Sequence, residues 1–147
     1  MNGHPTIQMF TSYWGNPKLK HLPQNQEWYI VQISTSCPKE LKFNNGKGIM
    51  IIYEVFQEVM PEWRIVEKVK QDHDEGYYYA EYMKKIFAHK DAIAKRIVDI
   101  YHNAQKQNKE RKIVFCCYEK PQDFCHRHIF ATFCNKMFSN LNITELQ

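Results

Sequence analysis

The segment Cys116–Arg127 constrains the fold most, because it reads as a strand, a loop and a helix in immediate succession. The apolar run Ile113–Cys117 is typical of a buried strand, and it gives way at Glu119 to a short polar turn. A helix is then predicted over 125–137, with Asp123 as its N-cap. Such a unit is typical of an α/β sheet, and its chemically reactive residues stand at the start of the helix.

Two earlier segments have the pattern of strands that end in small or polar residues. Thr6–Thr11 alternates in part and stops at the turn-forming loop Ser12–Pro17. The apolar segment Trp28–Ser34 also ends in small polar residues, and the last predicted strand is Lys112–Tyr118. In open α/β sheets, ligands bind outside the carboxyl ends of the strands. We therefore expect a binding site where these three segments end.

The chain between the second and third predicted strands has a mostly helical pattern. Pro61 suits the first turn of one helix, and Tyr77–Ala88 carries the apolar stripe of another. The preceding segment Gly48–Met60 is apolar and ambiguous, while Ser139–Gln147 reads as a loose tail. With no repeat and no linker, residues 1–147 predict a single three-layer, Rossmann-like α/β domain with a small, mostly parallel sheet flanked by helices.

The composition of the chain limits the cellular compartments and the binding partners that we expect. A chain of 147 residues suits one domain, and it contains no apolar run of about 18 residues, so no membrane contact is expected. The first residues lack the pattern of a signal peptide, and five cysteines, an odd number, are simplest as free thiols in the cytoplasm. The net charge of +4 is scattered along the chain, which argues against a nucleic-acid partner.

Cys125, His126 and Arg127 stand in a row at the start of the last predicted helix. With Asp123 as N-cap, Cys125 is the second helical residue, where the helix dipole and backbone N–H groups favour a thiolate. Arg127 offers a planar fork for a phosphate or carboxylate, and Glu119 can orient it or act as a general base. We therefore predict Glu119, Cys125 and His126 as catalytic residues and Arg127 as a ligand contact. A structural role, with Arg127 paired to Glu119, fits the same residues.

A metal site and a phosphatase-type loop are alternatives for this stretch. It holds a dense set of soft ligands, namely Cys116, Cys117, Cys125, His126, His128 and Cys134. However, no Cys-x-x-Cys pair exists, and Cys116 and Cys117 point to opposite faces of a strand, so three or four converging ligands are not assembled. We expect no metal and no other cofactor. The fifth residue after Cys125 is Phe130 rather than an arginine, which excludes a tyrosine-phosphatase-like loop.

The motif Glu119-Lys120-Pro121, followed by Phe124-Cys125-His126-Arg127, resembles a known family pattern. Weaker matches occur in the same order along nearly the whole chain, at 10–16, 33–38, 60–70 and 75–82. Together they are similar to the bacterial and phage family known as domain of unknown function number 488. The segment Gly46–Val59 departs from the pattern because it is longer and more apolar.

The resemblance implies a small three-layer α/β domain with a pocket where the strand ends meet, and it implies no established activity. It points to the pocket residues Ser12, Tyr13, Ser34, Glu119, Cys125, His126 and Arg127.

Two hypotheses about function follow. The first is an enzyme, a hydrolase or transferase, that binds or processes an anionic small molecule of a phosphorylated or nucleoside type. Tyr13 or Trp14 would stack on a flat ring of that ligand, with Ser12 and Ser34 as further contacts. The second is a non-enzymatic protein that captures a ligand, a nucleic acid or a host protein, as a phage-type sponge or inhibitor does. The apolar segment Ile49–Phe56 offers a homodimer contact in either case.

Overall fold

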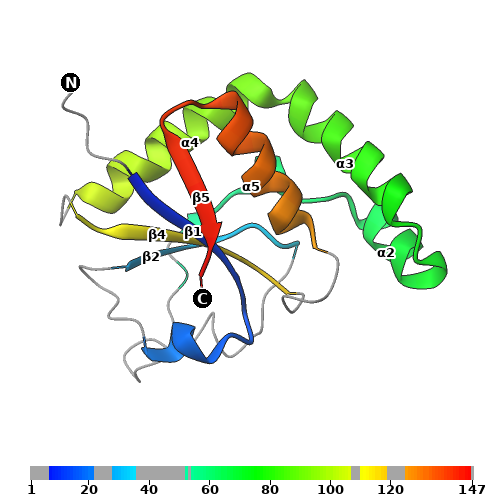
Figure 1. Cartoon of the computed structure of the whole chain (residues 1–147), viewed down its shortest axis with the longest axis horizontal. Helices are drawn as coiled ribbons and strands as arrows, with labels where there is room; N and C mark the ends of the chain where they lie inside the picture. The colour runs from blue at the N-terminus through cyan, green and yellow to red at the C-terminus, as the bar shows by residue number, and fades with distance from the viewer. Residues whose placement is uncertain are drawn as a thin grey trace.

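The computed structural model describes residues 7–21, 28–35, 52, 54–106, 110–118 and 125–146 (Figure 1). Its strands form one five-stranded sheet in the order β3-β2-β4-β1-β5, and every neighbouring pair in it is parallel. The strands are β1 (Ile7–Tyr13), β2 (Trp28–Gln32), β3 (Glu54–Val55), β4 (Lys112–Cys117) and β5 (Leu141–Glu145).

Helices make the crossovers that parallel neighbours require. Between β3 and β4 the chain forms α2 (Trp63–Asp72), α3 (Glu75–Ala88) and α4 (Lys90–Gln105), and α5 (His126–Met137) connects β4 to β5. Two short 3₁₀ helices, η1 (Pro17–His21) and η2 (Gln57–Val59), follow β1 and β3. The α-helices lie on one side of the sheet and η1 lies on the other (Figure 1). The structure therefore confirms the predicted three-layer α/β fold.

The alternation of side chains along β4 builds a core on each face of the sheet. Ile113, Phe115 and Cys117 belong to the larger hydrophobic cluster, which includes the inner faces of α3, α4 and α5. Val114 and Cys116 belong to a smaller cluster on the other face, which includes residues of η1 and its approach. The prediction that the two adjacent cysteines point to opposite faces is confirmed.

The expected loose tail is wrong for the last described residues, because they form the edge strand β5. β5 pairs in parallel with β1, and its inward residues Leu141 and Ile143 are buried while Asn142 is exposed. Asn135 of α5 fixes the strand further, since its amide donates to the carbonyl of Ile143 and accepts from the backbone N–H of the same residue. Pairing to β1, which local sequence does not reveal, decides this strand.

Helix starts also differ from the sequence-based expectation. The N-cap of α5 is Cys125, in an extended conformation with φ −147° and ψ 142°, so Cys125 precedes the first helical residue instead of being the second. Asp123 lies outside the described residues. In contrast, α3 has a side-chain cap, because the carboxylate of Asp74 accepts a hydrogen bond from the backbone N–H of Tyr77.

The segment predicted as a homodimer contact, Ile49–Phe56, is only partly described. Residues 49–51 and 53 lie outside the described residues. Phe56 is fully buried and packs against Phe115 and Phe130, so its ring belongs to the core rather than to a surface. Glu54 and Val55 form β3, beside β2. The dimer contact through the rest of the segment stays a prediction.

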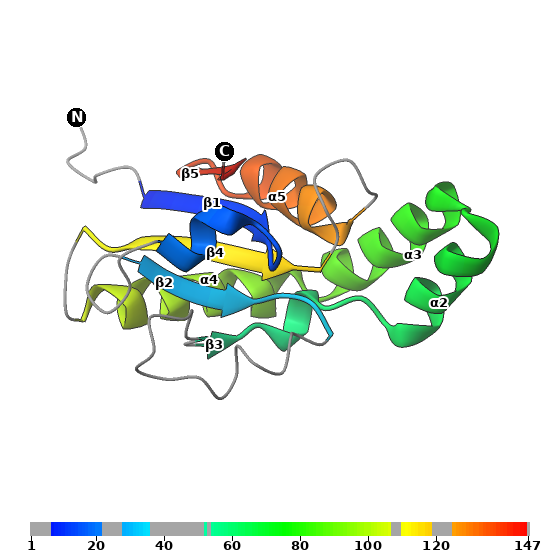
Figure 2. The same cartoon turned by 90° about the horizontal axis from the view of Figure 1, so that it is seen from below.

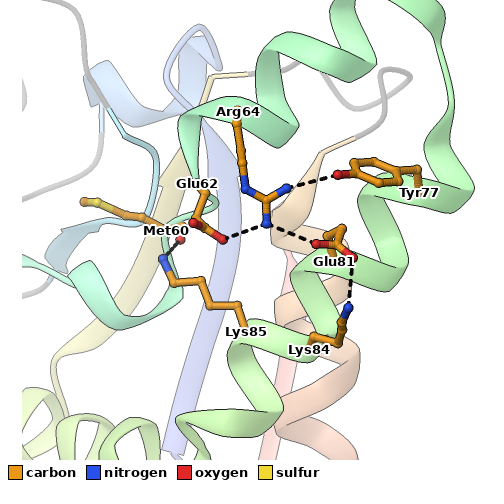
Figure 3. Close-up of polar contacts among 7 residues, drawn as sticks. All are labelled: Met60, Glu62, Arg64, Tyr77, Glu81, Lys84 and Lys85. Carbon is orange, nitrogen blue, oxygen red and sulfur yellow. Dashed lines mark hydrogen bonds and ion pairs between the residues drawn. The ribbon is translucent and has the colours of Figure 1, made fainter.

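Helices α2 and α3 form a hairpin beyond the carboxyl ends of the strands (Figure 2). A polar cluster on its outer side joins the two helices (Figure 3). The guanidinium of Arg64 donates to the carboxylates of Glu62 and Glu81 and to the hydroxyl of Tyr77, and Lys84 pairs with the other oxygen of Glu81. These exposed contacts add little stability. No helix among the described residues has the length and apolar character needed to traverse a bilayer.

Candidate functional site

The carboxyl ends of β1, β2 and β4 bring together a set of buried polar side chains. The register places Ser12 and Tyr13 beside Cys116 and Cys117, and Gln32 lies beside Cys116 on the other side of β4. The backbone N–H groups of Trp14 and Ile33 donate to the carbonyls of Cys117 and Cys116, so the three strands end at almost the same level. The predicted location of the site, at this edge of the sheet, is thus where polar groups gather.

Three of the predicted ligand contacts lie together, but they bond to neighbouring protein groups. The indole N–H of Trp14 donates to the hydroxyl of Ser34 at 3.0 Å, and the amide of Asn16 donates to the hydroxyl of Ser12 at 3.0 Å. Ser12, Trp14 and Ser34 are buried, whereas Tyr13 is partly exposed. Ser12, Trp14 and Ser34 are therefore buried at the carboxyl edge of the sheet, and Tyr13 is the more accessible aromatic ring there.

The N-terminus of α5 adds the reactive side chains. Cys125, His126 and Arg127 are buried, with 2%, 2% and 0% of their surfaces exposed. The sulfur of Cys125 lies 3.8 Å from Nδ1 of His126, and the structure joins it to the sulfur of Cys117, at the end of β4, in a disulfide. One donor atom from each of Cys117, Cys125 and His126 lies within 4.8 Å of the other two. We call these three residues the thiol–imidazole cluster.

His126 has a defined tautomer and a defined charge. Its Nε2 lies 2.7 Å from the carbonyl oxygen of Ile33, and because a carbonyl only accepts, Nε2 carries the hydrogen. Nδ1 then has a lone pair on the side that faces Cys125. Burial lowers the pKa of His126 to about 4. The imidazole is therefore neutral at pH 7 and offers an acceptor to the cluster.

Arg127 neighbours the cluster and is neutralised from within the protein. Its Nε donates to both carboxylate oxygens of Glu145, at 3.1 and 3.2 Å, and its Nη1 donates to the sulfur of Cys117 at 3.1 Å. The guanidinium carbon lies 5.6 Å from the centre of the Tyr13 ring. The sequence-based alternative paired Arg127 with Glu119, which lies outside the described residues.

Sequence reasoning missed Glu145 as a member of this region, and it named Cys117 only in a set of soft ligands that it did not expect to converge. Glu145 is the last residue of β5, and it also accepts a hydrogen bond from the hydroxyl of Thr11 at 2.7 Å. The available signal was the apolar–polar alternation Leu141-Asn142-Ile143, which indicates a strand and therefore a fixed Glu145. For Cys117 the signal was its inward position at the end of β4.

The remaining cysteines of the soft-ligand set lie apart from the cluster as inert thiols. Cys116 faces the smaller hydrophobic core, and burial raises its pKa well above the usual value. Burial in the larger core likewise raises the pKa of Cys134 to about 12. Both are free thiols and buried, so neither is suited to nucleophilic chemistry at neutral pH.

Tyr82 of α3 covers His126. The two rings meet edge to face with centroids 5.5 Å apart, and the Tyr82 hydroxyl donates to the carbonyl of Val59 at 2.5 Å. The Tyr82 side chain is fully buried, which raises its pKa well above 10.0. The hairpin thus closes the cluster from the side of α3.

Replacing Tyr82 by phenylalanine is expected to lower the free energy of unfolding by about 1–2 kcal/mol, because a buried carbonyl loses its donor. Urea denaturation measures this change. The matched control is Tyr79→Phe, whose ring is 51% exposed and whose loss of a hydroxyl should leave stability unchanged. Equal stability of wild type and Tyr82→Phe would show that the Val59 carbonyl finds another donor.

A concave surface lies between α3 and α5. It is an apolar groove of about 360 Å³ lined by Tyr79, Met83, Phe87, His128, Ile129, Thr132, Phe133, Lys136 and Met137. None of the predicted site residues lines it. The groove is therefore distinct from the residues at the strand ends.

The fold and the site together define a parallel α/β domain with a buried thiol–imidazole cluster at the carboxyl edge of its sheet. Comparisons of the chain with family models, with curated proteins and with solved structures gave no match. The resemblance noted from the sequence therefore stays a prediction, and the geometry of the described residues carries the functional argument.

Proposed function

We propose that the protein is an enzyme, of the hydrolase or transferase kind, that acts on a small anionic molecule at the carboxyl edge of its sheet. The observation that supports this most is the convergence of Cys117, Cys125 and His126 where β4 ends and α5 begins. Ligands of parallel α/β sheets bind at this edge, and the N-terminus of a helix favours negative charge. Reactive groups and an electropositive helix end thus share one place.

In this proposal His126 is the proton acceptor of the site. Its Nε2–H is held by the carbonyl of Ile33, so the ring cannot turn without loss of a buried hydrogen bond. Nδ1 is unprotonated and faces Cys125. In the reduced protein, a fixed imidazole with one bare nitrogen beside the Cys125 thiol would be the arrangement that general-base and nucleophilic catalysis use.

The proposal gives Arg127 and the aromatic residues narrower roles than the sequence suggested. Arg127 already pairs with Glu145 and donates to Cys117, so it acts by positioning Cys117 and by adding positive charge beside that sulfur. The indole N–H of Trp14 is bonded to Ser34, which leaves Tyr13 as the ring that contacts a nucleoside-type ligand. Glu119 keeps its proposed role as a second acid or base.

The test uses His126→Gln, because the glutamine amide can keep the donor to the Ile33 carbonyl while Nδ1 is lost. Wild type is incubated with a panel of nucleoside monophosphates, diphosphates and sugar phosphates, and products are quantified by mass spectrometry after denaturation. We expect turnover of at least one compound, and a decrease of about 100-fold or more in His126→Gln. His128→Gln, an exposed neighbour on α5, is the matched control and should keep its activity.

The rival function, capture of a ligand without turnover, predicts a different outcome of the same experiment. A capture protein returns its nucleotide unchanged after denaturation, and His126→Gln then binds as wild type does. A nucleic-acid partner would show itself by affinity that falls steeply with salt. Either result would contradict the proposal of an enzyme.

A further inference from the structure

We infer that Cys117, Cys125 and His126 form a binding site for Zn²⁺ or a similar thiophilic cation. The three residues offer two sulfurs and one imidazole nitrogen, which are the donor types that zinc prefers. Cys117 lies at the end of β4, and Cys125 and His126 lie at the start of α5. The two cysteines are eight residues apart in sequence, and the fold brings them together. This inference departs from the sequence-based expectation of no metal.

The separation of the donor atoms suits a tetrahedral ion. With bonds of about 2.3 Å to sulfur and 2.0–2.1 Å to nitrogen, adjacent ligands of a tetrahedral zinc lie roughly 3.6–3.8 Å apart. Sγ of Cys125 lies 3.8 Å from Nδ1 of His126, and all three donor atoms lie within 4.8 Å of one another. The two sulfurs are joined in the structure, so the ion can enter only after the bond is reduced and the sulfurs separate.

The surroundings of His126 are those of a metal ligand. A histidine that binds zinc through one nitrogen commonly donates its other N–H to a backbone carbonyl, which fixes the ring and the tautomer. Here Nε2 donates to the carbonyl of Ile33, and the bare Nδ1 faces the sulfur of Cys125. Tyr82 covers the ring from α3 and keeps it in this orientation.

The charges around the cluster also balance with a divalent cation. Two thiolates and one Zn²⁺ sum to zero, and the neighbouring Arg127 is offset by Glu145. The N–H of Arg127 that points at the sulfur of Cys117 favours negative charge on that sulfur. A buried set with no net charge avoids the large desolvation penalty of an unbalanced ion.

The structure records a disulfide between Cys117 and Cys125, and this oxidised state competes with the metal site. The Cα atoms of the two cysteines are 7.6 Å apart, whereas disulfides span about 4.4–6.8 Å. Two thiols whose Cα atoms are more than about 7 Å apart cannot be joined without backbone movement. An ion between the sulfurs fits the wider spacing.

Three protein ligands leave one position of a tetrahedral ion for water or an anion, which is the arrangement of catalytic zinc. With the ion bound, Nδ1 of His126 is a ligand and no longer a base, so the ion itself would supply the electrophile that binds the anionic substrate. This consequence rests on the proposed function, but metal binding itself can be measured without any substrate.

The experiment uses the full chain, purified under reducing conditions and stripped with a chelator. We expect one Zn²⁺ per chain by elemental analysis after zinc is returned. With Co²⁺ as the probe, a charge-transfer band from thiolate to cobalt and intense visible bands should show a tetrahedral site with sulfur ligands. Cys117→Ser, Cys125→Ser and His126→Gln should weaken zinc binding by more than the 10- to 100-fold that loss of an outer partner costs.

The controls are residues of the same type that lie outside the cluster. Cys116→Ser, Cys134→Ser and His128→Gln should bind one Zn²⁺ with unchanged affinity. A cysteine variant can fail to fold, so the cobalt spectrum of wild type decides alone: absence of the charge-transfer band overturns the inference. So does a stable Cys117–Cys125 disulfide in the reduced preparation, or equal zinc binding by all variants.

Failure of this inference is distinguishable from failure of the proposed function. Zinc binding without turnover of any tested nucleotide supports the metal site and contradicts the enzyme. Turnover that persists after complete removal of zinc supports the enzyme and contradicts a catalytic ion.

Discussion

Replacing Glu145 by glutamine is expected to lower the free energy of unfolding by about 3 kcal/mol. Its carboxylate balances Arg127, whose side chain has no exposed surface, and removal of one partner of a buried ion pair costs about 3–5 kcal/mol. The value should fall at the lower end of that range, because 21% of the Glu145 side chain is exposed. Guanidinium or urea denaturation of Glu145→Gln and wild type measures the difference.

Two further variants show whether the charge itself causes this loss. The double variant Arg127→Met/Glu145→Gln removes the buried charge and should recover part of the lost stability, since apolar replacements of buried pairs are often well tolerated. Glu62→Gln removes an ion pair in which both side chains are more than half exposed, and its midpoint should stay close to wild type. If Glu145→Gln loses less than about 1 kcal/mol, another acid balances Arg127, and the sequence-based candidate is Glu119.

The strands that surround the site could be predicted because β2 and β4 are mostly apolar runs, β1 alternates in part, and turn formers bound them. β1, β2 and β4 were found in this way, and so was the place where their carboxyl ends meet. Trp14 and Ser34 lie 20 residues apart in sequence, and they meet because both directly follow strands of one parallel sheet. Local sequence pattern, together with the rule that ligands bind at the carboxyl ends of parallel strands, is enough to predict these strands and the place where they end.

The edge strands β3 and β5 could not be predicted from local sequence pattern, because pairing with distant strands determines where they form. β3 has only two residues. β5 has five residues, of which only Leu141 and Ile143 are apolar. β5 becomes a strand by pairing with β1, more than 130 residues earlier, as the hydrogen bond from Thr11 to Glu145 also shows. Missing β5 also hid Glu145, and the ion partner of Arg127 was therefore sought at Glu119.

The thiol–imidazole cluster was missed for a different reason. The sequence correctly places Cys116 and Cys117 on opposite faces of β4, but it gives no distance between either face and the start of α5. Cys125 is the N-cap of α5 rather than its second residue, which turns its side chain toward the strand end instead of along the helix. A shift of two residues in a helix start thus decides whether the cysteines lie apart or together.

The second large effect concerns pH, and it is expected in the metal-free protein. The ordinary pKa of a histidine is 6.5, and the pKa of His126 falls to about 4 in the folded state. Burial is the main cause; the nearby charges of Arg127 and Lys85 add to it, and the hydrogen bond to Ile33 opposes it. Between these two pH values the unfolded chain binds a proton that the folded chain does not, so the folded state loses stability as the pH decreases from 6.5 to 4.

The expected loss is about 3 kcal/mol, because each unit of pKa shift corresponds to about 1.4 kcal/mol. The contribution of the neutral imidazole to stability is complete at a pH above the pKa of the unfolded state. At a pH below the pKa of the folded state, the loss of stability stops increasing. Free energies of unfolding of wild type and His126→Gln are measured from pH 7 to pH 4 with EDTA present. The advantage of wild type over His126→Gln should shrink by this amount across that interval.

His128→Gln is the control for this measurement. Burial lowers the pKa of His128 as well, but its side chain is exposed, so its variant should show a much smaller dependence. If wild type and His126→Gln lose stability in parallel, the imidazole does not stay neutral in the folded protein. Nδ1 would then carry a proton, and it could serve neither as the base of the proposed reaction nor as a ligand of a cation.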